Sequence, residues 1–426
     1  MGSVSTTVLW SEGQQVPVAV PDALPPAVDV LIVGAGYTGL SAARVLARAG
    51  REVLVLDAAP FGGGCSGRNG GQVAYSIKPT LATLSARHGK EIAAGICAEG
   101  QRAIAHLRSL AQDEGLAFDW RRRGCFVGAH TPKAFAARVR EAERHPSGYV
   151  QNVEIIPRSR QHEEIASDFY HGGCVYPDDT SIDPVKMLLA LHQQAAASGA
   201  MIIDRCAVQA LQKSEEGIEA ATTFGPVRAR QVLLATNGYS GALSPWHRRR
   251  VIPIGSYQIA TEPLGQARMR ELLPHGRNMG DSRRVVVYFR PSADGERIIF
   301  GGRAALAEKD PLVCVPRLKS MLAEIFPQLR NVGITHAWTG WVAYTFDTLP
   351  HLGRHDGIYY CMGYCGQGVT TAPYLGMRIA QQMLGLPEGA TAFDGLPFPS
   401  RPYYYGTPWF LAASVLAYRV LDRLGI

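Results

Sequence analysis

The sequence predicts an α/β fold in which a domain with a parallel sheet is assembled from distant segments, and an α+β domain with an antiparallel sheet is inserted in pieces. Three observations predict this fold: a strand–helix–strand unit near the start, extended segments in the middle, and a strand, Gly-rich loop and helix near the end. Because the chain has 426 residues, of which 46% are hydrophobic, it is long enough to give each of two domains its own core.

The opening unit covers residues 28–57. VDVLIV is an apolar, β-branched run that ends at Gly34, and TGLSAARVLARAG has apolar residues at helical spacing and a natural helix stop at Gly50. EVLVLD is a second strand directly after the helix. Together they form a βαβ unit of about thirty residues, the usual size.

The segments after this unit alternate between helix and strand. Residues 85–112 have apolar residues at near-helical spacing, and we expect them to leave the first domain. A helix should begin at Pro184, because Asp183 is a good N-cap and proline suits the first helical position; it should end at Gly199. Strands at 200–210 and 231–235 follow.

Between 246 and 335 the pattern changes to extended segments, IPIGSYQIAT, RVVVYFR and RIIFGGR, with turn residues such as Asp294 and Gly295 between strands. This pattern indicates an antiparallel sheet in a different domain. From 357 to 386 the strand GIYYCMG, a Gly-rich loop and the helix APYLGMRIAQQML restore the order of the opening unit. The expected division is an N-terminal extension of 1–27, a nucleotide-binding domain of 28–85, 175–245 and 336–395, a substrate-binding domain of 86–174 and 246–335, and a tail of 396–426.

The tail contains a candidate amphipathic helix, PWFLAASVLAYRVLDRLGI, which is too short and too charged to span a bilayer. We expect it to pack against the body of the protein. A peripheral contact with a membrane surface is the alternative, because Trp409 and Phe410 beside basic residues would suit an interface.

Charge, cysteine spacing and the N-terminal sequence each exclude a class of protein. The net charge of +7 includes basic triplets at 121–123 and 248–250, but without interleaved aromatic residues they indicate solvated faces or attraction to an anionic cofactor or substrate, not nucleic acid. The eight cysteines show no CxxC spacing, so we expect free thiols and no metal site; redox activity of Cys361 and Cys365 is the alternative. Since no window resembles a signal peptide, we expect a cytoplasmic protein.

The motif GAGYTG follows the first strand and opens the first helix. Glycines there allow a tight turn that brings backbone N–H groups and the helix N-terminus against a pyrophosphate. Asp57 ends the second strand 23 residues after Gly34, where its carboxylate can accept hydrogen bonds from ribose hydroxyls and would repel the extra phosphate of NADP. The sequence therefore predicts a Rossmann-like, dinucleotide-binding domain.

A second motif, GGGCSGRNGGQ at 62–72, follows the second strand at once. Its glycines let the backbone approach a flat ring system, and its polar side chains at Ser66, Arg68, Asn69 and Gln72 can contact it. A flexible surface loop is the alternative. This loop favours FAD over NAD, which share the preceding turn.

The strand, GAGYTG, Asp57 and CSGRNGGQ together resemble the amino-terminal half of the D-amino-acid oxidase and glycine oxidase superfamily, and within it the gamma-glutamylputrescine oxidoreductase type. RARQVLLATNGYSG resembles the family's strand and turn beside the flavin. Val208 matches a position whose backbone usually contacts the adenine. WTGWVAYTFDTLPHLG (338–353) and GYCGQGVTTAP (363–373) resemble the two segments that approach the isoalloxazine ring.

The resemblance implies FAD as the cofactor and assigns its contacts. The residues implied to bind FAD are Gly34, Gly36, Tyr37, Thr38, Gly39, Asp57, Ser66, Arg68, Asn69, Gly70, Gly71, Gln72, Val208, Ala235, Thr236, Asn237, Gly363, Gly366, Gln367, Gly368, Val369 and Thr370. Sarcosine oxidases of this superfamily join flavin to a cysteine in the region of 338–350, where this chain has none, so we expect noncovalent FAD. Gln367 lies where relatives often have histidine.

The resemblance also implies the activity: hydride removal from the carbon beside an amine nitrogen to flavin N5, which gives an imine. Expected substrates are a secondary amine, a D-amino acid or a gamma-glutamyl polyamine, with O2 reduced to H2O2. The sarcosine oxidases also use a lysine to activate oxygen, and the matching strand here offers Ile298, Ile299 and Phe300 instead, so a dehydrogenase that reduces a quinone or carrier is the alternative. A non-catalytic nucleotide-binding protein is a second alternative. Candidate substrate contacts are Tyr257, Tyr288, Arg290 and Tyr344.

Overall fold

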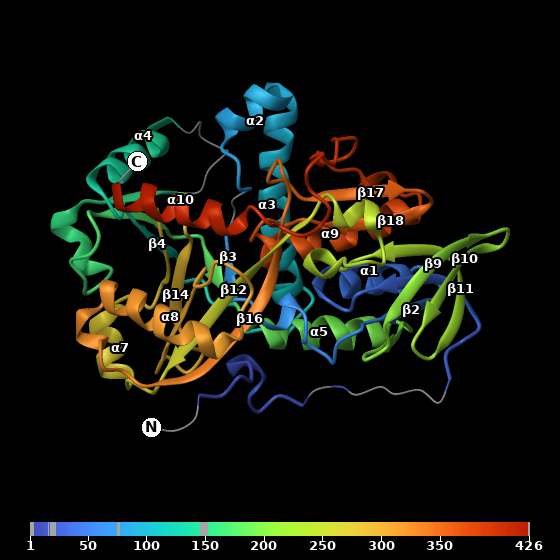
Figure 1. Ribbon diagram of the computed structural model, residues 1–426, viewed down its shortest axis with the longest axis horizontal. Coiled ribbons are helices and arrows are strands. Elements are labelled where there is room, and N and C mark those ends of the chain that lie inside the picture. Colours follow the sequence, from blue (N-terminus) through green and yellow to red (C-terminus); the bar gives the residue numbers. More distant parts are fainter. Residues whose placement is uncertain (1–3, 16, 18–22, 75–76, 145–151, 425–426) are drawn as a thin grey trace.

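The computed structural model describes residues 4–15, 17, 23–74, 77–144 and 152–424 and confirms the mixed α/β fold. Within these residues, two sheets of eight strands each lie side by side, with helices on their faces (Figure 1). The first sheet contains the opening unit, and the second contains the middle segments that the sequence predicts as extended.

The first sheet is parallel at its centre. Its strands are β1 (Ala27–Val33), β2 (Val53–Leu56), β8 (Met201–Ile203), β9 (Val208–Ser214), β10 (Gly217–Thr222), β11 (Gly225–Leu234), β17 (His351–His355) and β18 (Ile358–Met362). The order is β17-β18-β11-β1-β2-β8, with β17 antiparallel to β18 and the β9–β10 hairpin antiparallel to β11. Along β1, Val30 and Ile32 enter one core while Leu31 and Val33 enter another, so both faces are buried, as expected for a parallel sheet.

Three helices pack together beside this sheet, α1 (Tyr37–Arg48) between α5 (Pro184–Ala197) and α9 (Gly368–Met383) (Figure 1). The predicted start of α5 is confirmed, because the Asp183 carboxylate accepts the backbone N–H groups of Val185 and Lys186, each at 3.0 Å. Helices α1 and α9 approach closely at Gly376, where a Cβ atom would lie 2.4 Å from the Thr38 carbonyl oxygen.

The second sheet is antiparallel except where β13 runs parallel to β4. Its strands are β4 (Cys125–Gly128), β5 (Glu154–Ile156), β6 (Gly173–Tyr176), β12 (Ile252–Thr261), β13 (Asn278–Asp281), β14 (Val287–Pro291), β15 (Ile298–Gly302) and β16 (Ile334–Tyr344). Their order is β16-β12-β15-β14-β13-β4-β6-β5. One face packs on α8 (Pro311–Ile325), where Leu318 and Leu322 join Tyr257 and Phe300 in a core.

The remaining elements are shorter or peripheral. They are α4 (Pro132–Arg144), α6 (Pro245–Arg248), α7 (Gln266–Leu272), β3 (Gln72–Val73), β7 (Thr180–Ser181) and the 3-10 helices η1 (Leu9–Ser11), η2 (Cys65–Gly67), η3 (Arg158–Glu163), η4 (Asn237–Tyr239), η5 (Pro327–Leu329) and η6 (Pro387–Gly389). The N-terminal extension is not detached from the body, because Trp10 is buried and its Nε1 donates to the Asn69 carbonyl oxygen at 2.9 Å.

The helix expected over 85–112 is two helices in the structure. Gly89, with a φ of 84°, separates α2 (Leu81–His88) from α3 (Lys90–Gln112). Helix α3 does not leave the first domain as expected, since Ile96 and Leu107 are fully buried in the core beside the first sheet. The apolar spacing revealed the helix but not the core that it enters.

Two expected domain boundaries fall inside strands. The boundary at 335/336 lies within β16, which pairs with β12 from Thr261↔Ile334 to Ile252↔Tyr344 and so belongs to the second sheet. The boundary at 174/175 lies within β6, another strand of the second sheet. In both cases, pairing with strands distant in the chain places the whole strand in the second sheet. The division into two domains remains a proposal, with these two boundaries moved to the ends of the strands.

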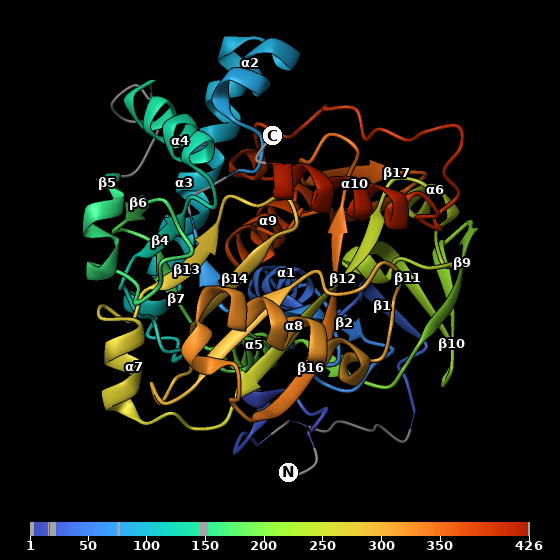
Figure 2. The same cartoon turned by 60° about the vertical axis from the view of Figure 1, so that its left-hand side comes forward.

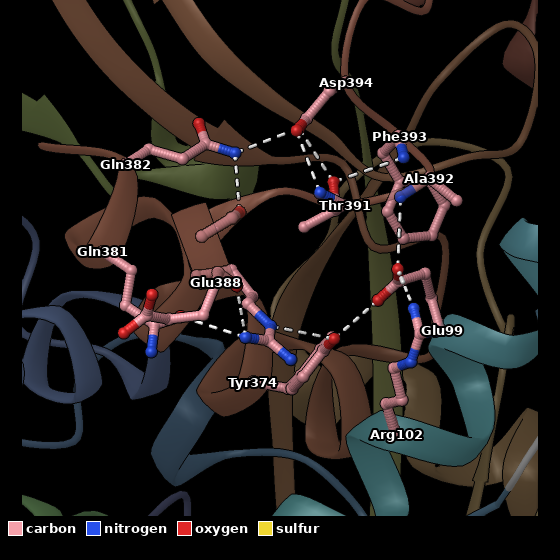
Figure 3. A network of polar contacts seen from close by, with 12 residues as sticks. Glu99, Arg102, Tyr374, Gln381, Gln382, Glu388, Thr391, Ala392, Phe393 and Asp394 are labelled. Carbon is pink, nitrogen blue, oxygen red and sulfur yellow. Dashed lines mark hydrogen bonds and ion pairs between the residues drawn. The ribbon is translucent and has the colours of Figure 1, made fainter. Parts of the chain in front are cut away.

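A polar network joins α3, α9 and the segment at 391–394 (Figure 3). The Glu99 carboxylate on α3 is almost fully buried and accepts the Tyr374 hydroxyl at 2.6 Å, the Ala392 N–H at 3.1 Å and the Arg102 guanidinium at 2.8 Å. A buried carboxylate requires such partners. The network therefore ties α3 to the nucleotide domain beyond apolar packing.

The predicted C-terminal helix is α10 (Leu411–Leu424), which lies on the outside of the molecule, on the side of α9 and β14 (Figures 1 and 2). Its packing against the body is described below. Among the residues that the structure describes, no helix is both long enough and apolar enough to cross a bilayer. A peripheral membrane contact of α10 stays a prediction.

Candidate active site

A single large cavity of about 1610 Å³ extends from the carboxyl ends of β1 and β2 to the second sheet. Ligands of open α/β sheets bind at that end of the strands. The predicted cofactor residues that line it are Gly34, Gly36, Tyr37, Thr38, Asp57, Ser66, Arg68, Asn69, Gly70, Gln72, Val208, Ala235, Thr236, Asn237, Gly366, Gln367, Gly368 and Val369. The fold thus brings segments separated by more than half of the chain to one cavity.

The turn between β1 and α1 has the shape that a pyrophosphate requires. Gly34 has a φ of 110°, and a Cβ atom there would lie 2.8 Å from the Ala235 carbonyl oxygen. A Cβ on Gly36 would lie 2.9 Å from Ser66 Oγ, which accepts the Tyr37 N–H at 3.0 Å. Only glycine fits at these two positions, and both line the cavity, so a phosphate can approach the positive N-terminal end of α1.

Asp57 lies beside this turn at the end of β2. Its Oδ2 accepts the Ala35 N–H at 2.8 Å, and its Oδ1 accepts the Ala59 N–H at 2.9 Å. Each carboxylate oxygen has a second lone pair, and the residue lines the cavity, so it can accept ribose hydroxyls as well. Burial raises the pKa of Asp57, while the two backbone N–H groups oppose that rise.

Asn69 fixes the loop that follows. Its Nδ2 donates to the Ser66 carbonyl oxygen at 2.9 Å and to the Tyr37 hydroxyl at 3.2 Å, and its Oδ1 accepts the Gly71 N–H at 2.8 Å. The loop is therefore internally braced rather than a flexible surface segment, and it is held against the N-terminus of α1.

Four predicted cofactor residues lie outside the cavity lining: Gly39, Gly71, Gly363 and Thr370. Two of them, Thr370 and Gly363, link segments that lie beside the cavity. The Thr370 hydroxyl donates to the Ala74 carbonyl oxygen at 3.1 Å, which joins the start of α9 to the residue directly after β3. The Gly363 N–H donates to Asn237 Oδ1 at 2.9 Å and joins the end of β18 to the turn after β11.

Two of the four candidate substrate contacts line the cavity, Tyr288 and Tyr344. The Tyr288 hydroxyl hydrogen-bonds with Ser256 Oγ at 3.0 Å, and burial raises its pKa, so this phenol stays neutral. The Tyr344 hydroxyl accepts Lys78 Nζ at 2.8 Å. Both phenols are thus held in fixed positions on the cavity wall.

The other two candidates, Tyr257 and Arg290, do not line the cavity. Side chains alternate along β12, so Ser256 and Gln258 face the cavity while Tyr257 points into the core on α8 and donates its hydroxyl to Glu308 at 3.1 Å. The geometry therefore corrects the prediction that Tyr257 and Arg290 contact the substrate.

Arg290 supports the Gly-rich loop from behind. Its Nη1 donates to the carbonyl oxygens of Gly71 at 3.0 Å and Ile182 at 2.9 Å, and its guanidinium lies over the Trp10 ring. Burial lowers its pKa to about 10, which still leaves it charged at neutral pH. Because Arg290 lies behind the loop and outside the cavity lining, it is not placed to pair with a substrate carboxylate.

Gln258 and Lys78 are among the cavity residues that the sequence analysis missed. Gln258 is almost fully buried; its Nε2 donates to the Arg68 carbonyl oxygen at 2.6 Å, and its Oε1 is buried without a hydrogen-bond partner. Such an acceptor on a cavity wall is suited to a ligand N–H. A polar residue within the apolar strand IPIGSYQIAT was the available signal. Lys78, which lines the cavity, had no signal in its local sequence.

Comparisons with known proteins agree with this geometry. A family model described as DAO, FAD dependent oxidoreductase, matches residues 29–382. Gamma-glutamylputrescine oxidoreductase of Escherichia coli is 32% identical over 403 residues, 93% of this chain and 93% of that protein. The probable oxidoreductase OrdL of Haemophilus influenzae is 31% identical over 377 residues, 87% of this chain and 86% of that protein. The crystal structure of glycine oxidase from Geobacillus kaustophilus superposes with a TM-score of 0.72 at 20% identity, covering 89% of this chain and 100% of that one.

Proposed function

The chain belongs to the DAO family of FAD-dependent oxidoreductases, and we propose from this premise that it oxidises the C–N bond of an amine or amino acid to an imine, using noncovalently bound FAD. The observation that carries the proposal is the continuity of one cavity from the dinucleotide turn, at Gly34 and Asp57, to the second sheet at Tyr288 and Gln258. A cofactor and an organic substrate can therefore meet inside it. Relatives named for amine and amino-acid substrates support this class.

In this proposal the N-terminus of α1 holds the pyrophosphate, Asp57 the ribose hydroxyls, and the loop at 366–369 the ring system. When bound, FAD supplies a hydride acceptor at its N5 atom. The chain's own residues position the substrate: Gln258 Oε1 is an acceptor for the amine, and the fixed Tyr288 ring bounds the space beside Gly70. The protein acts mainly by positioning and by excluding water.

Noncovalent attachment is supported by the thiols on the cavity wall. In the part of the chain that the structure describes, three cysteines line the cavity. Burial raises the pKa of Cys65 and of Cys365 to about 11 and that of Cys125 well above its usual value, so all three are neutral and weakly nucleophilic at pH 7. No histidine is among the described residues that line the cavity. We expect acid precipitation of the purified yellow protein to leave all of the flavin in the supernatant, measured by absorbance; flavin retained in the pellet would contradict noncovalent binding.

The substrate class is tested by anaerobic bleaching of the flavin. A panel of D-amino acids, sarcosine-like amines and glutamylated polyamines is mixed with the protein, and absorbance near the flavin maximum is followed. We expect at least one member to reduce the flavin fast enough to support turnover. If none does while dithionite reduces it fully, the proposed reaction is wrong, and a non-catalytic nucleotide-binding protein becomes the better description.

We propose O2 as the acceptor. Lys78 and Arg68 on the cavity wall supply positive charge that favours the reduction of oxygen to an anion. Substrate-dependent peroxide formed in air, in amounts equal to the substrate consumed, would support an oxidase. Turnover that requires a quinone or an artificial dye would instead indicate a dehydrogenase.

A further inference from the structure

The C-terminal segment forms part of the cavity wall. Its lining residues are Tyr403, Phe410, Leu411, Ser414, Val415 and Tyr418. All of them lie after residue 382, where the family match ends. We propose that α10 closes the substrate end of the cavity and sets the length of aliphatic chain that an amine substrate can carry; this rests on the proposed function.

One face of α10 is turned to the cavity. Leu411, Val415 and Tyr418 line it at spacings of four and three residues, which place them on one side of a helix. Val415 is 5% exposed, whereas the adjacent Leu416 is 49% exposed. The helix therefore offers two neighbouring apolar residues, one on the cavity and one on the outside, as a matched pair for substitution.

The helix is anchored beside the second sheet at its C-terminal end. The Asp422 carboxylate accepts the backbone N–H groups of Arg284 at 2.8 Å and Val285 at 3.1 Å, directly before β14. Arg419 Nη2 donates to the Ala304 carbonyl oxygen at 3.0 Å, after β15. These contacts hold the C-terminal part of α10 beside the ends of β14 and β15, and α10 lies on the outside of the molecule in both overall views (Figures 1 and 2).

The segment leading into α10 is anchored as well. Tyr404 is fully buried, and its hydroxyl donates to the Val251 carbonyl oxygen at 2.8 Å. Its ring also packs edge-on against Phe346, which lines the cavity. The position of α10 is therefore fixed at both ends, so its inner face is a wall of defined shape.

The surfaces near this wall suit hydrocarbon. Val285 and Val286 precede β14 in the lining, and Ile252 and Ile254 on β12 add to it. Two of the charged side chains in the lining, those of Arg303 and Arg283, are paired within the protein. Arg303 donates to Glu308 at 2.8 Å and to the Gly255 carbonyl oxygen at 2.7 Å.

Arg283 is paired with the buried Asp281. With these two arginines paired inside the protein, the apolar residues of this wall match an uncharged aliphatic chain that extends from the oxidised carbon. The substrate class that fits is an amine with an aliphatic chain, whose methylene groups pack against Leu411 and Val415.

The test mixes straight-chain primary amines, from butylamine to decylamine, anaerobically with the FAD-loaded protein, and the Kd is taken from the amine concentration that half-saturates the flavin absorbance change, or the rate of flavin reduction where the amine reduces the flavin. For the unmodified chain we expect the Kd to fall roughly four-fold per methylene until the chain meets α10, and then to level off or rise. Val415→Ala and Leu411→Ala should move this break to longer amines. Val415→Trp should move it to shorter ones, and Leu416→Trp should leave it in place.

A break that stays at the same chain length in the Val415 and Leu411 variants would overturn the proposal, as would the absence of any dependence on chain length. The two alanine variants keep the test valid if the tryptophan does not fold. Failure of the proposed function would look different: the amines would bind with a chain-length dependence that α10 variants shift, yet no amine would reduce the flavin.

Discussion

Replacement of Gly39 by alanine is expected to give a protein that purifies with less than about a tenth of its flavin. A Cβ atom at this position would lie 1.9 Å from the Gly34 carbonyl oxygen. The Gly34 backbone cannot yield independently, because its N–H donates to Leu56 at 2.8 Å. The methyl group must therefore push α1 away from the phosphate turn, at a cost of about 3 kcal/mol, which reduces affinity by roughly a hundred-fold.

The measurement is the ratio of flavin to protein absorbance after purification, with FAD titration of the flavin-free form and far-UV circular dichroism to show that it is folded. Gly95→Ala is the matched control, because Gly95 is also a helical glycine but lies on α3 outside the cavity lining, and a Cβ there would meet only the Ala392 side chain, at 3.1 Å. A Gly39→Ala protein with the normal flavin content would show that the turn does not hold the cofactor as proposed.

The parts of the site predicted from sequence are those that depend on local backbone geometry. The turn at Gly34 and the N-cap at Asp183 each follow from a few adjacent residues, and the structure has both where the sequence indicates. Asp57 lines the cavity because the carboxyl ends of parallel neighbours β1 and β2 meet at one edge. Such features need no knowledge of distant contacts.

The incorrect assignments depend on partners far along the chain. A strand pattern shows that neighbours such as Tyr257 and Gln258 face opposite sides, but not which side is the core, since α8 comes some fifty residues later. Arg290 is predicted from the sequence to pair with a substrate carboxylate, but its guanidinium donates to the carbonyl oxygens of Gly71 and Ile182, which are distant in the chain. For the same reason the cavity role of Lys78 could not be predicted.

Replacement of Asp57 by alanine is expected to weaken FAD binding by about 3 kcal/mol, roughly a hundred-fold in Kd. The change removes the acceptor of the ribose hydroxyls and leaves the N–H groups of Ala35 and Ala59 without their partner. Titration of the flavin-free protein with FAD, followed by flavin fluorescence, measures the effect. Asp29→Ala is the control, because Asp29 also lies on the first sheet and pairs with Arg51 away from the cavity.

Asp57→Asn separates the two roles of this carboxylate. The amide can still accept one backbone N–H through its oxygen, but its NH2 group cannot accept a second N–H or a hydroxyl proton. If Asp57 mainly binds the ribose, the asparagine variant should lose FAD affinity while the flavin-free protein unfolds at nearly the unmodified temperature. Equal losses of thermal stability and affinity would mean instead that the carboxylate acts by holding the turn at Ala35, and that the ribose contact is secondary.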